Sequence, residues 1–395
     1  MTKKILATAC DAGPANNMQG PLNLLKGKED LEVIVISEGP STNIFKSNSM
    51  EPRTIEDYGF DELTSEAAIE ILIQEKPDLL FTGISAVSDI ERFFIYAARE
   101  VSNGRIKTVS ILDGYDFSSV KLKDTKVSPE YRFKPDYVFV ANSDVLETLA
   151  VEDFDRTQLI ITGLPSYDHL INLKKLCNPE DIAVIRRELN VSQDAYLVTF
   201  LSQALLKVAK IAKAIEDHGY TELTALEATE NSLAELDINN LYLFVRSHPH
   251  EDLEVTKTAL KGKLQRINFS NTYDTRRAMV ASDLVIGMFS TLMPEAAYLD
   301  KDVFSVKPDY TFDDTTTFLH NPMGYAVPTN DRLITNSIGL SIPAYKKETV
   351  TPHLHTLMTN NYTREQLKQR RSKLVLDGMS TQRAADAIYQ ILESQ

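Results

Sequence analysis

Cationic and hydroxyl-bearing residues follow two apolar runs in the second half of the chain. Arg246 and His248 come directly after one run, and Ser290 and Thr291 come shortly after another. Proline follows His248 and restrains it to an extended backbone, which ends the strand there. The guanidinium and the imidazole then face outward as hydrogen-bond donors, and such donors suit phosphate oxygens.

Ser290 and Thr291 lie in a turn between a predicted strand and a helix that Pro294 and Glu295 open. Proline is tolerated there because the backbone N–H groups of a first helical turn lack partners. The turn directs free N–H groups and two hydroxyls toward one point, which suits an anion. The same hydroxyls would serve equally well as helix caps. The residues alone leave capping and ligand binding open.

Acidic residues follow predicted strands in the first half of the chain. Asp113 ends a buried run before Gly114, where it could act as a general base toward a hydroxyl group. An Asp-Gly pair is also an ordinary turn. Glu91 lies at the start of a helix, where a carboxylate stabilises the helix dipole or takes part in catalysis. Gly13 either permits close backbone approach to a ligand or belongs to a simple turn.

Several familiar chemistries lack their motifs. The chain has no G-x-G-x-x-G, no Walker A sequence and no G-x-S-x-G. Hydride transfer, P-loop NTP hydrolysis and α/β-hydrolase chemistry therefore lose support. His353 and His355 have metal-ligand spacing but no carboxylate or cysteine partner nearby, so we interpret them as surface residues and expect no metal.

Composition limits the partners. The formal charge of −14 argues against binding to nucleic acid, which needs a positive field. Cys10 and Cys177 are too few for a disulfide framework. No leader pattern begins the chain and no apolar run approaches the length of a membrane span, so we expect a cytoplasmic protein. Association with the inner membrane surface stays open, because a small apolar or basic patch would leave no such pattern.

The elements that position these residues alternate between strand and helix. This alternation predicts parallel sheets with helices on both faces. The expected strands are 4–9, 31–36, 79–82, 107–112, 137–140, 159–161, 196–201, 241–245, 284–286 and 303–306.

The length of 395 residues predicts two domains. We expect an N-terminal Rossmann-like acceptor domain over 1–165, a linker over 166–192 and a C-terminal Rossmann-like donor domain over 193–375. A helix over 376–395 would close the chain. Ligands of such sheets bind beyond the carboxyl ends of the strands, so two domains facing each other would form one central cleft.

The order of several loose motifs resembles the two-Rossmann-domain glycosyltransferases, known as the GT-B fold, and the related UDP-N-acetylglucosamine 2-epimerases. The resemblance covers nearly the whole chain. The motifs are the turn near Gly13, Thr162-Gly163-Leu164-Pro165 with Asp168, Arg246-x-His248-Pro249, the segment 281–296 with Ser290-Thr291 and Glu295, and Asp377-Gly378-x-Ser380-x-x-Arg383.

The His-Pro and Ser-Thr pairs are most similar to enzymes with CMP- or CDP-activated donors, namely sialyltransferases, polysialyltransferases, Kdo transferases and CDP-glycerol glycerophosphotransferases. This resemblance implies that His248, Ser290 and Thr291, with Arg246, bind the donor phosphate. It further implies that Asp113, which precedes Gly114, is the catalytic base; Glu91 is our second candidate from its position alone. Gly13 would approach the donor, and Glu295 would bond a ribose or sugar hydroxyl of the donor or simply begin its helix.

The resulting expectation is a metal-independent, cofactor-free glycosyltransferase of polysaccharide biosynthesis. It would move a sugar from a CMP- or UDP-sugar to a glycan or lipid-linked acceptor. The alternatives are a UDP-N-acetylhexosamine 2-epimerase and a nucleotide-sugar-binding protein without catalysis. The sequence leaves the sugar, the acceptor, the stereochemical outcome and the oligomeric state open.

Overall fold

The computed structural model describes most of the chain. The described residues are 2–84, 89–102, 104–114, 133–152, 154–207, 219–236, 238–248, 250–312, 316–329, 331 and 333–394. Pro249, which was expected to restrain His248, lies outside them. Within these residues, no helix is long and apolar enough to cross a lipid bilayer.

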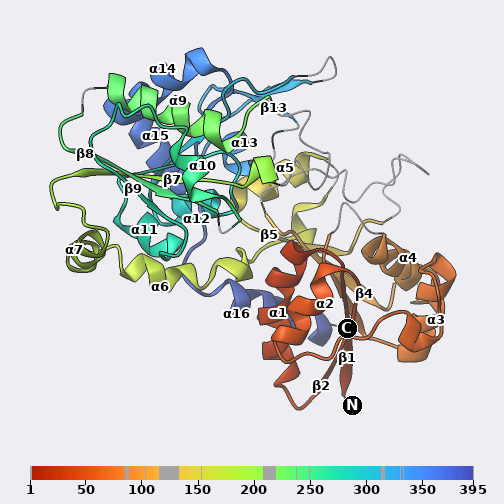
Figure 1. Ribbon diagram of the computed structural model, residues 1–395. Coiled ribbons are helices and arrows are strands. Elements are labelled where there is room, and N and C mark those ends of the chain that lie inside the picture. The colour runs from red at the N-terminus through yellow and green to blue at the C-terminus, as the bar shows by residue number, and fades with distance from the viewer. Residues whose placement is uncertain are drawn as a thin grey trace. The chain divides into compact units, whose positions relative to one another are not determined.

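The chain forms two compact units, shown in Figure 1. Unit 1 comprises Met1–His169 and Lys373–Gln395, and unit 2 comprises Leu170–Ser372. This division differs from the expected one at both ends of unit 2. The segment 376–395 belongs to unit 1, and most of the expected linker 166–192 belongs to unit 2.

Unit 1 is built on a parallel sheet, as predicted. The described part of the sheet has the strand order β2-β1-β3-β4-β5-β6. Its strands are β1 (Lys3–Ala9), β2 (Leu31–Ser37), β3 (Leu79–Thr82), β4 (Lys107–Ile111), β5 (Tyr137–Val140) and β6 (Leu159–Ile161). Its helices are α1 (Ala12–Lys26), α2 (Pro40–Ser47), α3 (Ser65–Glu75), α4 (Ile90–Ser102), α5 (Ser143–Glu152) and α16 (Ser380–Glu393).

Helices cover both faces of this sheet, because alternate residues of each strand are apolar on opposite sides. Ile5 and Ala7 of β1 pack with residues of α1 and α16 on one face. Leu6 of β1 packs with residues of α3 and α4 on the other face. Figure 1 shows α3 and α4 on one side of β1 and α1 on the other.

Unit 2 repeats the plan. The described part of its main sheet has the order β14-β11-β10-β7-β8-β9. The strands are β7 (Tyr196–Leu201), β8 (Leu241–Arg246), β9 (Ile267–Ser270), β10 (Leu284–Gly287), β11 (Asp302–Val306) and β14 (Ile342–Ala344). A short antiparallel pair, β12 (Phe318–His320) and β13 (Ala326–Pro328), stands apart from it. The helices are α6 (Leu170–Lys175), α7 (Pro179–Glu188), α9 (Glu222–Glu235), α10 (Leu253–Lys257), α11 (Thr275–Ala281), α12 (Leu292–Tyr298), α13 (Ile334–Ser337), α14 (Lys347–Thr359) and α15 (Asn361–Arg371).

The core of unit 2 lies between its sheet and the helices α9, α14 and α15. Phe200 of β7, Leu243 of β8 and Ile286 of β10 are fully buried in it. Strands β7, β8 and β10 are neighbours in the sheet and run parallel, so their carboxyl ends lie at one edge. The turns after these three strands carry most of the predicted phosphate-binding residues.

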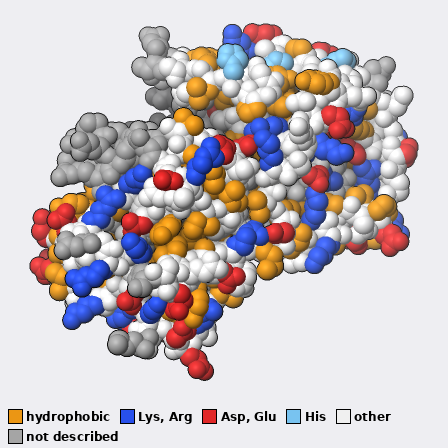
Figure 2. Space-filling model, turned by 180° about the vertical axis from the view of Figure 1, so that it is seen from behind, with side chains coloured by type: hydrophobic (Ala, Val, Ile, Leu, Met, Phe, Trp, Pro, Cys, Tyr) orange, Lys and Arg blue, Asp and Glu red, His pale blue; other side chains and the backbone are white. Residues whose placement is uncertain are grey.

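On the face shown in Figure 2, charged side chains of both signs are mixed. Figure 2 shows acidic and basic side chains interspersed over the face that it displays. No large region of that face carries basic side chains alone. Such a surface does not collect a polyanion by a broad positive field.

Candidate functional site in unit 2

The carboxyl ends of β7, β8 and β10 open onto a pocket of about 340 Å³. The pocket is lined by four residues that the sequence analysis predicted to bind phosphate: Arg246, His248, Ser290 and Thr291. The other lining residues are Leu201, Ser202, Gln203, Ser247, Thr275, Phe289 and Leu292. A parallel sheet offers its ligand site at this edge, because the strands end there together and the turns alone decide the chemistry.

Arg246 is the last residue of β8, and hydrogen bonds hold its side chain in place. Its Nε donates to Thr275 Oγ1 at 2.8 Å, and its Nη1 donates to the carbonyl oxygen of Ser247. Burial lowers the pKa of the guanidinium, while the charge of Glu251 acts in the opposite direction. Arginine remains protonated in proteins, so the pocket has one fixed positive charge.

His248 is half-buried and its protonation state follows from its surroundings. Desolvation lowers the pKa of the imidazole first, and His250, Arg246 and Lys207 lower it further. Its Nδ1 accepts a hydrogen bond from the backbone N–H of His250 at 3.2 Å. A neutral ring whose Nδ1 is an acceptor carries its proton on Nε2. His248 is therefore a hydrogen-bond donor through Nε2 at neutral pH.

Glu251 holds the turns after β7 and β8 together. One oxygen, Oε1, accepts from the backbone N–H of His248 at 3.0 Å. The other, Oε2, accepts from Ser202 Oγ at 2.9 Å and from Thr256 Oγ1 at 3.2 Å. Burial raises the pKa of this carboxyl, and these hydrogen bonds oppose the rise. Glu251 thus acts through His248 and fixes its position.

Ser290 and Thr291 differ in how they serve helix α12. Ser290 Oγ accepts from the backbone N–H of Leu292 at 3.3 Å, so it caps the helix in part. Thr291 occupies the N-cap position, but its side chain makes no capping hydrogen bond. Thr291 is exposed beside the pocket. Capping therefore explains Ser290 better than it explains Thr291.

The sequence interpretation missed Gln203 and Ser247. Both line the pocket, and both lie in turns directly after predicted strands. Gln203 Oε1 accepts from the backbone N–H of Phe289 at 2.9 Å, which ties the turn after β7 to the turn after β10. Their position after a strand was the only signal for these two residues. Polar residues are common in turns, so this position alone did not single them out.

Glu295 does not lie in the pocket as a donor-binding role requires. Arg276 on α11 binds it with two hydrogen bonds, from Nε at 2.7 Å and from Nη2 at 2.8 Å. The carboxylate is buried, with 8% of its side chain exposed. This bidentate pair links α11 to α12 and occupies both oxygens of Glu295. The structure assigns it a positioning role within unit 2.

Unit 1 brings Asp113 and Gly13 together after β4 and β1. A Cβ atom on Gly13 would overlap Asp113 Oδ2, so the first turn of α1 approaches this carboxylate as only glycine allows. The close backbone approach expected at Gly13 is therefore present, but toward Asp113 of the same unit. Asp113 is half-buried at the end of its strand.

Glu91 lies near the same edge of unit 1, in the first turn of α4. Only 3% of the residue is exposed. Its Oε1 accepts from the backbone N–H of Cys10 at 3.2 Å, while its Oε2 has no hydrogen-bond partner within the described chain. Burial raises the pKa of this carboxyl to about 7, and the charges of Asp11 and Glu38 add to the rise. A carboxyl with such a pKa can exchange a proton near neutral pH.

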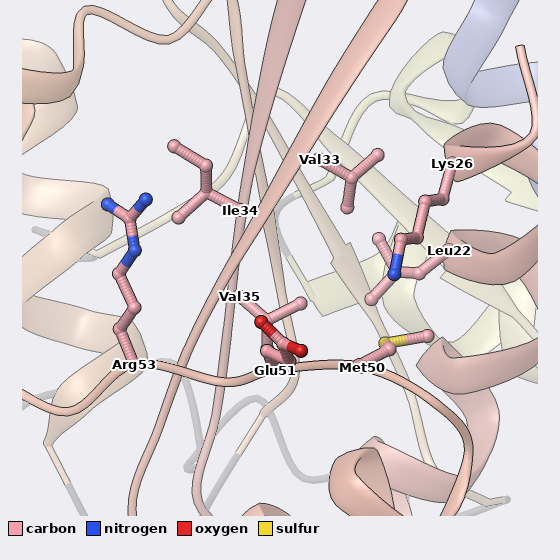
Figure 3. A pocket seen from close by; sticks show the side chains of 8 residues that line it. All are labelled: Leu22, Lys26, Val33, Ile34, Val35, Met50, Glu51 and Arg53. Carbon is pink, nitrogen blue, oxygen red and sulfur yellow. The ribbon is translucent and has the colours of Figure 1, made fainter.

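Unit 1 contains a cavity that lies away from Gly13, Glu91 and Asp113. It has a volume of about 260 Å³ and lies along the middle of the edge strand β2 (Figure 3). Its lining includes Val33 and Val35 of β2 and Lys26 of α1. Glu51 and Arg53, from the segment that follows α2, also line it. It holds none of the predicted site residues, and it does not lie at the carboxyl ends of the strands.

Comparison with solved structures identifies the fold. The chain superimposes on S. aureus MnaA in its UDP co-structure with a TM-score of 0.58 at 14% identity, over 100% of this chain and 98% of that one. A putative UDP-N-acetylglucosamine 2-epimerase from Listeria monocytogenes gives 0.60 at 14% identity, with the same coverage. Acinetobacter baumannii MurG gives 0.60 at 13% identity, over 99% and 100%. These proteins share the GT-B fold with this chain.

Comparison by sequence identifies the family. No curated protein matches the chain significantly. Residues 113–336, more than half of the chain, match the family model described as CDP-Glycerol:Poly(glycerophosphate) glycerophosphotransferase. The matched stretch runs from Asp113 through the whole pocket of unit 2. This chain is therefore a member of the glycerophosphotransferase family, a transferase with the GT-B fold.

Proposed function

We propose that the protein transfers glycerol phosphate from CDP-glycerol to a hydroxyl group of a poly(glycerophosphate) type of acceptor. The observation that carries this proposal is the unit 2 pocket, where Arg246, His248 and Thr291 converge within the stretch that matches the family. The sequence analysis expected a sugar as the transferred group. The family description favours glycerol phosphate, and either group would leave CMP as the product of a cytidine donor.

The chemistry needs a nucleophile and a stabilised leaving group. The acceptor oxygen forms a bond to the β-phosphorus, and the bond between that phosphorus and the bridging oxygen breaks. CMP leaves with the electron pair, and Asp113 takes the proton of the acceptor hydroxyl. Negative charge that grows on the departing phosphate is stabilised by the Arg246 guanidinium and by the Nε2–H group of His248. No step calls for a metal ion.

Product analysis with defined donors tests the proposal. The purified protein is incubated with CDP-glycerol, with a CMP-sugar and with a UDP-N-acetylhexosamine, each with and without a glycerophosphate oligomer. We expect CMP release and a longer oligomer with CDP-glycerol, at the same rate with and without EDTA. Release of CMP from the CMP-sugar alone would support the sugar donor instead.

A uridine nucleotide is the second candidate donor, because the similar S. aureus MnaA structure contains UDP. An epimerised UDP-sugar formed without acceptor would support an isomerase. Binding of these nucleotides with no turnover would support a non-catalytic binding protein. Either result would contradict glycerophosphate transfer.

Two substitutions separate binding from turnover. We expect His248→Ala to weaken CDP-glycerol binding about 10- to 100-fold, the loss of one hydrogen bond to a charged group. Asp113→Asn should leave binding unchanged and abolish turnover. His355→Ala, on the exposed side of α14, serves as the histidine control for both. If Asp113→Asn keeps full activity, the base is another residue, and Glu91 is tested next.

A further inference from the structure

We propose that Ser247 and Gln203 bind the nucleotide phosphate, so that the turns after β7, β8 and β10 each contribute a side chain to one anion site. This inference rests on the proposed function and extends it to residues that neither the sequence motifs nor the family match single out. It assigns the phosphate of a nucleotide as their ligand.

Ser247 has a buried hydroxyl without a hydrogen-bond partner among the residues that the structure describes. The residue is 0% exposed, and its Oγ has no hydrogen-bond partner in the described part of the chain. Its backbone, in contrast, is fully engaged: the N–H donates to Ser270 O at 3.1 Å, and the carbonyl accepts from Arg246. A buried polar group without a partner destabilises a fold. Its place in the wall of the pocket gives this hydroxyl a partner only when a ligand is bound.

Gln203 has a fixed orientation. A backbone N–H can only donate, so the atom that receives the Phe289 N–H must be the amide oxygen. The two N–H donors of Nε2 are then directed away from Phe289. Because Gln203 lines the pocket, these donors are available to a ligand there.

The surroundings favour an anion over a cation. Arg246 lines the pocket, and the positive charges of Arg246 and Lys207 both act on His248. The carboxylates of Glu251 and Asp274 both act on Arg246. Both oxygens of Glu251 accept hydrogen bonds from neighbouring groups, and Asp274 accepts from the first backbone N–H groups of α11. Within the described residues, the Ser247 hydroxyl has no acceptor for its proton, and a phosphate oxygen would supply one.

The site is also rigid before a ligand binds. The backbone N–H of Ser202 donates to Arg246 O at 3.0 Å, which joins the turns after β7 and β8. Gln203 joins the turns after β7 and β10 through Phe289. Donors that are held in place bind an anion without a large ordering cost.

The first test is Ser247→Ala, because it separates a ligand-binding role from a structural one. Titration calorimetry of the full chain with CMP, CDP and inorganic phosphate should show about tenfold weaker binding. The melting temperature without ligand should stay the same or rise, since the hydroxyl that is removed has no partner. A structural role would instead lower the melting temperature and leave the affinity unchanged.

Thr8→Val is the matched control. Thr8 in unit 1 is also 0% exposed, and its Oγ1 also lacks a hydrogen-bond partner within the described residues. Its replacement should change stability in the same direction as Ser247→Ala and leave nucleotide affinity as in the wild type. Equal affinity losses in both variants would overturn the proposal.

The second test is Gln203→Glu, which keeps the shape of the side chain. One carboxylate oxygen can still accept from Phe289, while the other replaces the amide donors with negative charge. Phosphate affinity should fall more than tenfold, and further than in Gln203→Ala.

The outcomes distinguish this inference from the function beneath it. If the wild type binds CDP and His248→Ala does not, while Ser247→Ala and Gln203→Glu bind normally, the inference is wrong and the proposed function stands. If the wild type binds none of the three probes and no CDP-glycerol, both fail.

Discussion

At the scale of single residues, the partners of a buried group decide its chemistry. Glu91 and Glu295 are both glutamates near the start of a helix, and both are buried. Glu295 has the guanidinium of Arg276 against both oxygens. Glu91 has only backbone N–H donors, its own and that of Cys10, and its Oε2 has no partner within the described residues. Desolvation is the largest influence on Glu91 and raises its pKa to about 7, because the backbone hydrogen bonds offset only part of it.

This raised pKa predicts how Glu91→Gln changes stability with pH. Between pH 4.5 and about 7 the folded protein holds a proton that the unfolded chain releases, so the wild type loses stability as the pH rises through this window. The amide of the variant never ionises. Above pH 7 the variant should be more stable by up to about 3 kcal/mol, at about 1.4 kcal/mol for each unit of pKa shift.

Hydrogen exchange of the β1 and β3 amides at pH 5 and pH 8 measures the effect. The pH 5 values form the reference, because the folded carboxyl is still neutral there and the stability difference should be only about a quarter of that at pH 8. A stability difference that does not grow between these pH values would contradict the raised pKa. If Glu91 is also the base, the variant should lose turnover at every pH.

At the scale of elements, two motifs that carried the family resemblance turn out to join α16 to unit 1. Asp168 accepts from the backbone N–H groups of Ser380 at 3.0 Å and Thr381 at 2.7 Å, so its carboxylate caps α16. Arg383 Nε donates to Thr162 O at 2.9 Å. Gly163 has a φ of 80°, and a Cβ there would overlap Ser380 Oγ. These residues serve the fold rather than the pocket.

The cap predicts a local loss of stability in Asp168→Ala. Two backbone donors of α16 would lose a charged acceptor, at a cost of about 2 kcal/mol. Hydrogen exchange in α16 should accelerate, while the amides of β7 and β10 in unit 2 should not change. Asp377→Ala is the control, since it breaks a partly exposed ion pair with Arg383 and one backbone hydrogen bond from Met379, and it should cost less than Asp168→Ala. Equal losses of stability in the two variants would show that the hydrogen bonds of Asp168 contribute no more to α16 than the contacts of Asp377.

At the scale of the whole molecule, the chain enters unit 2 once and returns to unit 1 at its end. Residues 373–395 complete unit 1, because Ala384, Ile388 and Leu392 of α16 are buried in its core with Ile5 and Met18. Unit 2 is continuous in sequence and has a core of its own. That the two units face a common cleft stays a prediction.

This connectivity predicts the result of ending the chain at Ser372. Unit 1 would lose one face of its core and should lose the protection of its β1 and β3 amides. Unit 2 should keep the protection of β7, β8 and β10 and should still bind CDP. Intact protection in unit 1 would show that α16 is dispensable, and loss of protection in unit 2 would show that the two units fold together.

The sequence by itself determined the fold class and the strands that lead into the pocket. Strand and helix periodicity is local, so the runs that became β1, β7, β8 and β10 could be identified without a structure. The turns after them could be identified in the same way, which is why Arg246, His248, Ser290 and Thr291 were chosen and lie in one pocket. Their role in binding stays a prediction.

Only the tertiary structure decided which polar side chains already have hydrogen-bond partners within the protein. Arg276 forms an ion pair with Glu295, and Glu251 accepts a hydrogen bond from the backbone of His248. The hydroxyl of Ser247 has no hydrogen-bond partner within the described chain. The apolar stripe of α16 was visible in the sequence, but the unit that it completes was not. The reason is physical: periodicity depends on near neighbours in the chain, whereas hydrogen-bond partners, burial and pKa depend on residues that folding brings from far away.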